Sequence, residues 1–209
     1  MPAYFSTYIV LLIISAAITF SASLTARKRK APGSSTLTAL LVALSMWSAF
    51  SAAQYIQEGF AAKFFWLNVM VVPVAAVPIL FMNFILKFSG NTVWFTRRTL
   101  IAFFVFSIAF ILLQWTNSYH HLVLSSVQLV EQDGFPVLEI QRGPIYFVNL
   151  ALAYSTVTIG TLTLMREALR ASNLYRNQYR LLLLGCIIPF AFSIYSQVKY
   201  ISFSSLDIS

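Results

Sequence analysis

The sequence predicts an all-α membrane protein with six transmembrane helices and one small extracellular β-hairpin between the fourth and fifth helices. Two observations predict this fold class. Hydrophobic residues make up 59% of the 209 residues and charged residues only 10%, whereas soluble domains carry roughly 25% charged residues. In addition, six stretches of 18 residues or more contain no charged residue: 1–26, 31–57, 64–86, 99–130, 143–165 and 181–198. Soluble helices need a polar face, and a helix of about 20 apolar residues spans a bilayer.

Each charge-free stretch is expected to contain one transmembrane helix of a single integral-membrane domain that covers 1–209. The first stretch is similar to a secretory signal, but its positive charges follow the apolar core, whereas a signal carries them in front. We therefore expect it to stay in the protein as an anchor. The spans are predicted near 4–26, 34–56, 64–86, 98–115, 145–165 and 181–198.

One loop, 116–144, is long enough to have a structure of its own. It contains two β-prone runs, LVLSSVQLVEQ and FPVLEIQRG, on either side of Asp133-Gly134. Asp-Gly between two such runs is typical of a tight hairpin turn. We expect a small hairpin that lies over the outer ends of the helices.

The basic residues predict how the chain crosses the membrane. Eleven of the fourteen Lys and Arg residues fall in the loops after the first, third and fifth spans, with only Glu167 among them. Because an excess of Lys and Arg marks cytoplasmic loops, we expect these loops inside a cell membrane that the chain crosses several times. The N-terminus, loop 116–144 and residue 209 would then be extracytoplasmic. A cytoplasmic output after residue 209 would need one more span. We therefore expect either that the chain is incomplete or that its output is not located at this C-terminus.

Several function classes are disfavoured because no ionisable residue lies in the middle of a predicted span. Such residues mark proton relays, ion-coupled transport and intramembrane catalysis, so we expect neither an enzyme nor a cofactor. The basic residues lie between the spans and not on one amphipathic face, which argues against nucleic acid as a partner. His120 and His121 are adjacent, which is not the helical spacing of metal ligands. We therefore expect no metal site, and we favour a structural cap at the hairpin over a pH sensor.

Neutral polar residues within the spans are the remaining candidates for function. They are Gln54, Asn68, Asn83, Gln114, Asn149 and Gln197. Two interpretations stay open: hydrogen bonds between helices, each contributing roughly 0.6–2 kcal/mol, or a polar cavity that holds a ligand. Pro73 and Pro78 lie between two of these amides in the third span, and Pro189 lies in the sixth. Because proline frees a carbonyl and bends a helix, these positions predict a pocket wall, a hinge or a static kink.

Three segments carry a resemblance to a known family. The third span contains FWLN at 65–68 followed by Pro73 and Pro78, and the fourth span ends in WTNSYH at 115–120. The third segment is RNQYR at 176–180, followed by LLLLG and then Ile188-Pro189. Together they resemble the N-terminal seven-helix sensor region of bacterial and archaeal histidine kinases, including its Thr-Asn-x-x-His turn. The similarity runs over nearly the whole chain.

The resemblance implies a membrane-embedded sensory module of a signal-transduction protein, the N-terminal part of a sensor histidine kinase in a two-component system. The family's seventh helix and kinase domains would follow Ser209, and any kinase activity would belong to them. The implied partners are the lipid bilayer, an unknown small ligand, a cytoplasmic output domain and a second copy of the chain. A small six-helix transporter or a membrane-complex assembly subunit is the alternative. The candidate sensing residues are Asn68, Asn83, Gln114, Thr116, Asn117 and His120.

Overall fold

The chain forms a membrane-spanning helical protein with one hairpin. A computed structural model describes residues 3–90, 97–132, 134–170 and 173–206. Six of the described helices are long and apolar enough to cross a membrane, and the two-stranded sheet lies between the fourth and fifth of them. The predicted fold class, six spans with a hairpin between the fourth and the fifth, is therefore confirmed. The extracellular position of the hairpin stays a prediction. The elements are α1 (Ala3–Arg27), α2 (Ser34–Ile56), α3 (Phe60–Ser89), α4 (Arg97–Trp115), α5 (Asn117–His120), β1 (Leu124–Gln132), β2 (Phe135–Arg142), α6 (Pro144–Arg170) and α7 (Asn173–Leu206).

The chain divides within α6 into two compact units, 1–157 and 158–209. The first unit contains α1 to α5, the hairpin and the first half of α6. The second unit contains the rest of α6 and α7. The single domain expected from the sequence stays a prediction.

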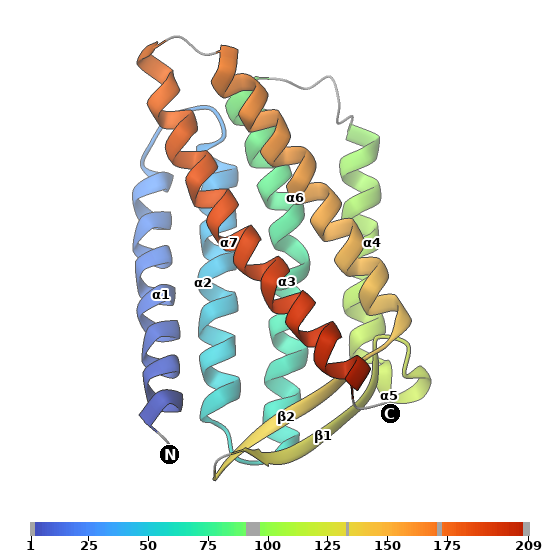
Figure 1. Ribbon diagram of the computed structural model, residues 1–209. Coiled ribbons are helices and arrows are strands. Elements are labelled where there is room, and N and C mark those ends of the chain that lie inside the picture. The colour runs from blue at the N-terminus through green and yellow to red at the C-terminus, as the bar shows by residue number, and fades with distance from the viewer. Residues whose placement is uncertain (1–2, 91–96, 133, 171–172, 207–209) are drawn as a thin grey trace. The chain divides into compact units, whose positions relative to one another are not determined.

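Neighbouring helices of the first unit pack in chain order. Helix α1 packs on α2, α2 on α3, and α3 on α4 (Figure 1). The first two approach closely enough for the Ser45 hydroxyl to donate to the Ala16 carbonyl at 2.9 Å. Large apolar side chains such as Leu11 and Ile18 point away from these contacts and are 58% and 62% exposed. Such surfaces are stable in a bilayer, where hydrocarbon takes the place of water.

Several helices are longer than the spans predicted from charge-free stretches. Helix α3 covers Phe60–Ser89 instead of 64–86, and α7 covers Asn173–Leu206 instead of 181–198. The prediction stopped each span at the first charged residue. Lys and Arg are good helix formers, and their long side chains reach a polar environment from a helix end. The helices therefore continue through these residues.

Pro73 and Pro78 lie inside α3, and Pro189 lies inside α7. Each proline removes one backbone donor and disturbs the helical hydrogen bonds of the preceding turn. In the turn before Pro78, Ser107 of α4 donates its hydroxyl to the Ala75 carbonyl at 3.2 Å. A neighbouring helix thus supplies a polar partner where the α3 ladder is disturbed. The bends expected at the three prolines stay predictions.

The two strands form an antiparallel hairpin between α5 and α6, as the sequence predicted. Gly134 has a φ of 75°, the left-handed conformation that a tight turn requires. Asp133, the other residue of the predicted turn, lies outside the described residues. The strand register pairs Val127 with Ile140 and Leu129 with Leu138.

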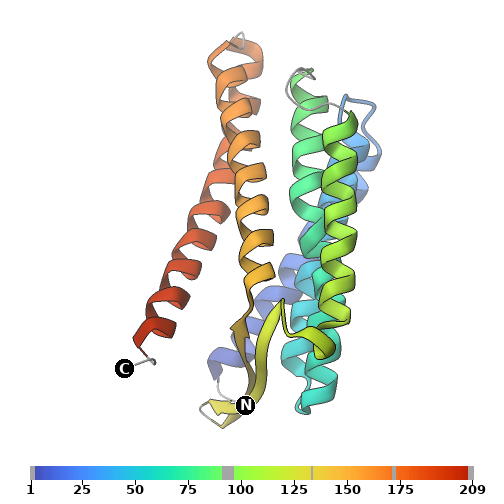
Figure 2. The same cartoon turned by 90° about the vertical axis from the view of Figure 1, so that its right-hand side faces the viewer.

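The hairpin has one apolar and one polar face, because side chains alternate along a strand. Val127, Leu138 and Ile140 pack against the core of the first unit. Gln128 and Glu139, which are also cross-strand partners, lie on the other face. The hairpin therefore covers the ends of α3 and α4 beside α5 (Figure 1 and Figure 2).

The core beneath the hairpin contains residues from both helices and from the first strand. Its buried members are Leu67, Ala75, Phe110, Val123 and Leu124. Val123 has no exposed surface, and Leu124 is 5% exposed. The start of β1 is thus anchored between α3 and α4 by apolar packing.

Candidate functional site

Five of the six predicted sensing residues come together where α3 and α4 meet the hairpin. This hairpin-end cluster consists of Asn68, Gln114, Thr116, Asn117 and His120. It includes Asn68 from α3, Gln114 from α4 and the turn through α5 that leads into β1. Asn68, Gln114 and Asn117 are buried, whereas Thr116 is exposed and His120 is half-buried. The cluster therefore extends from the helix interior to the surface.

Asn117 ties the short helix α5 to the first strand. Its Nδ2 donates to the Leu124 carbonyl at 2.8 Å, and its Oδ1 accepts from the amides of Val123 and Leu124 at 3.0 Å each. The side chain is 4% exposed, so water has little access to these bonds. One amide side chain thus satisfies three backbone groups at the point where the chain turns from helix into strand. Unsatisfied buried backbone groups are costly, which explains why a polar residue is buried here.

Asn68 and Gln114 form a hydrogen bond between α3 and α4. Gln114 Nε2 donates to Asn68 Oδ1 at 2.9 Å. The two side chains are 7% and 2% exposed. For this pair, the structure shows the hydrogen bond between helices, the first of the two interpretations left open by the sequence. The bond joins the helices less than one helical turn from Asn117.

His120 closes the α5 turn through both of its ring nitrogens. Its Nδ1 accepts from the Leu122 amide at 3.0 Å, and its Nε2 lies 3.3 Å from the Thr116 hydroxyl. That hydroxyl in turn donates to the Leu112 carbonyl at 2.8 Å. Because Nδ1 is an acceptor, the consistent assignment is a neutral ring with its proton on Nε2. The chain of bonds runs from α4 to the first residues before β1.

Two residues at the base of the hairpin, His121 and Gly143, have backbone positions that restrict which side chains can occupy them. His121 ends α5 with a φ of 54°, and its amide donates to the Asn117 carbonyl at 2.8 Å. Gly143 follows β2, and its amide donates to the Val123 carbonyl at 2.8 Å. A Cβ on Gly143 would collide with the Leu122 backbone carbonyl. Glycine is therefore required here by close approach of two backbone segments.

Lys63 was not among the residues singled out from the sequence, yet it joins α2, α3 and the hairpin. It is 2% exposed, and its Nζ donates to the Gln54 carbonyl at 3.3 Å near the end of α2. The same Nζ lies 4.9 Å from the centre of the Phe135 ring at the start of β2. A cation over an aromatic face is attracted by about 0.5–2 kcal/mol. Only its place directly before an apolar span could have drawn attention to it, and its partners are not visible in the sequence.

Asn83 is not part of the cluster. It is half-buried in α3, fifteen residues after Asn68, which corresponds to about 22 Å along a helix. Asn83 therefore lies near the other end of α3, close to Lys87. The six predicted residues form one cluster of five and one separate position.

The chemistry of the hairpin-end cluster is that of neutral hydrogen bonding. Its side chains are amides, a hydroxyl and an imidazole, and their partners are mostly backbone groups. Within the described ranges, no three His, Cys, Asp or Glu side chains are close enough together to hold a metal ion. The arrangement is suited to holding the hairpin against the helices in one defined position.

The chain matches one protein-family model. Residues 10–209 match the model described as the N-terminal 7TM region of histidine kinase. The match begins within α1 and includes the other five helices that are apolar enough to span a membrane, the hairpin and the whole cluster. Searches of curated proteins and of solved structures found no significant match. The resemblance identified in the sequence is thereby confirmed.

Proposed function

Because the chain belongs to the family formed by the N-terminal seven-transmembrane regions of histidine kinases, we propose that it detects a stimulus at the hairpin end and passes it through its helices to a cytoplasmic kinase. The family match and the membrane-spanning helices support a membrane sensory module of a histidine kinase. They favour this role over the transporter and assembly-subunit alternatives.

One observation carries the proposal: polar bonds link the hairpin directly to the transmembrane helices. Asn117 binds the first strand, Gln114 lies three residues earlier and binds Asn68, and Lys63 contacts the second strand through Phe135. A displacement of the hairpin must break or rearrange some of these bonds. The hairpin and the ends of α2, α3 and α4 therefore move as coupled parts.

The mechanism is a shift between two arrangements of the hairpin and the helix ends. A stimulus acts only by binding one arrangement better than the other. The closed arrangement keeps the Asn117 and Asn68–Gln114 bonds, and the other arrangement opens them. A small ligand or a membrane state that competes for these polar groups would favour the open arrangement. Asn68, Gln114, Thr116, Asn117 and His120 are the proposed sensing residues, and Asn83 is a separate polar position that relays the shift along α3.

We infer the direction of signalling from the distribution of the basic residues between the loops. Eleven of the fourteen basic residues lie in the loops at the end opposite the hairpin, according to the order of the spans. The positive-inside rule puts that end in the cytoplasm. The hairpin with Gln128, Glu131 and Glu139 would then face the outside, where a stimulus arrives.

Cysteine labelling of two exposed serines tests this orientation. Ser118 lies at the hairpin end and Ser35 at the opposite end of the same unit, and both are exposed. In a Cys186→Ser background, we expect a membrane-impermeant maleimide to label Ser118→Cys on intact cells. Ser35→Cys should react only after permeabilisation. The reverse pattern would refute the proposed direction of signalling.

A further inference from the structure

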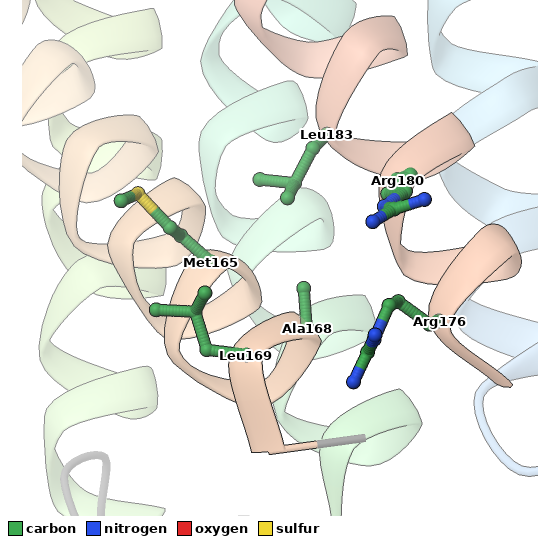
Figure 3. A pocket seen from close by; sticks show the side chains of 6 residues that line it. All are labelled: Met165, Ala168, Leu169, Arg176, Arg180 and Leu183. Carbon is green, nitrogen blue, oxygen red and sulfur yellow. The ribbon is translucent and has the colours of Figure 1, made fainter. Parts of the chain in front are cut away.

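A cavity of about 370 Å³ lies inside the second unit, between the end of α6 and the start of α7. Four apolar side chains line it, from Met165, Ala168, Leu169 and Leu183. Arg176 and Arg180 complete the lining (Figure 3). Its volume is within the range of small-molecule sites, about 300–1,000 Å³. The cavity combines an apolar wall with two cations.

The two arginines lie on one face of α7 because they are four residues apart. Glu167 is the only acid in the sequence between 143 and 206, and it interacts electrostatically with Tyr179. Arg166 and Arg170 lie on α6 but do not line the cavity. With two arginines in its lining, the cavity is electropositive.

The cavity also lies at the edge of the membrane. The apolar span of α7 begins at Arg176, and that of α6 ends at Arg170. A bound molecule could thus have a charged end at the water boundary and an apolar end beside the helices. Guanidinium groups are suited to phosphate oxygens, which they bind through two parallel hydrogen bonds.

We propose that this cavity binds the headgroup of an anionic phospholipid. Arg176 and Arg180 bind the phosphate, while Met165, Leu169 and Leu183 contact the first carbons of the acyl chains. Basic pockets between transmembrane helices at the cytoplasmic side are suited to such headgroups. The site shares no residue with the hairpin-end cluster and does not depend on the sensory role proposed above.

Native mass spectrometry of the purified chain tests the proposal. The protein in detergent is titrated with phosphatidylglycerol, with phosphatidylcholine and with inorganic phosphate, and bound molecules are counted by mass. The variant Arg176→Gln/Arg180→Gln is compared with Arg166→Gln/Arg170→Gln. Both variants remove two positive charges from the region where α6 ends and α7 begins. Only the Arg176→Gln/Arg180→Gln variant removes residues that line the cavity.

The proposal predicts that the chain binds one molecule of phosphatidylglycerol more tightly than it binds phosphatidylcholine. Inorganic phosphate should bind much more weakly than phosphatidylglycerol. Each cation near an anionic lipid contributes about a fivefold gain in affinity. The Arg176→Gln/Arg180→Gln variant should therefore bind roughly 25-fold more weakly. The Arg166→Gln/Arg170→Gln variant should stay within about threefold of the original chain. Equal losses in the two variants, equal binding of the two lipids, or phosphate binding as tight as that of the lipid would each overturn the proposal.

Discussion

Replacing Asn117 by alanine is the perturbation that most directly separates the hairpin from the helices. The change removes three hydrogen bonds of 2.8 to 3.0 Å to the start of β1. Each bond contributes about 0.5–1.5 kcal/mol net, and water replaces them poorly because Asn117 is 4% exposed. We take about 3 kcal/mol as the total, which raises the equilibrium constant for hairpin opening by about 150-fold.

Hydrogen exchange of the protein in lipid nanodiscs measures this opening locally. We expect amides in 122–142 to exchange about 150-fold faster in Asn117→Ala, in proportion to the opening constant, while amides within α1 and α2 keep their rates. Ser118→Ala is the matched control, because Ser118 is the exposed neighbour in the same short helix. Exposed substitutions of this kind change stability by about 0.5 kcal/mol at most. An acceleration below threefold in 122–142, or equal acceleration throughout the chain, would show that the three Asn117 bonds do not hold the hairpin on the helices.

Three further predictions concern the contacts that hold the hairpin in place. Gly143→Ala should lower Tm and speed exchange at the hairpin base, because the new Cβ would meet a backbone carbonyl; an unchanged Tm would show that the base has room. A double-mutant cycle of Asn68→Ala and Gln114→Ala should give a coupling free energy of about 0.6–2 kcal/mol in denaturant unfolding; purely additive effects would exclude the bond. A cycle of Lys63→Met and Phe135→Leu should give a coupling of about 0.5–2 kcal/mol, and a coupling of zero would remove Lys63 from the hairpin contact.

Much of the fold follows from local sequence features. Apolar stretches without charge predicted the six long helices, because a bilayer requires about 20 such residues in a helix. The Asp-Gly pair between β-prone runs predicted the hairpin, in which Gly134 has the expected left-handed conformation. The helix ends were harder to predict, since α3 includes Lys63 and α6 continues to Arg170. A charged side chain marks where the membrane ends, but the helix backbone continues beyond it.

The candidate site was only partly predictable. The amides Asn68 and Gln114 stood out because polar groups in an apolar span need partners, and they bind each other. Nothing in the sequence indicated that Asn117 binds backbone groups six and seven residues later, because that depends on the fold of the α5 turn. The role of Lys63 likewise depends on the end of α2 and the start of β2 meeting in space.

The central claim is that the hairpin end controls a kinase through the helices. The direct test measures the rate of autophosphorylation of the full-length protein in proteoliposomes. The rates of the Asn117→Ala and Ser118→Ala variants are compared with that of the original protein. Our account predicts that Asn117→Ala changes the rate of phosphorylation at least threefold, because it shifts the balance between the two hairpin arrangements. Ser118→Ala should leave the rate unchanged. Equal rates in both variants, together with accelerated hydrogen exchange at 122–142 in Asn117→Ala, would contradict the claim, since the hairpin would then open without any effect on the output.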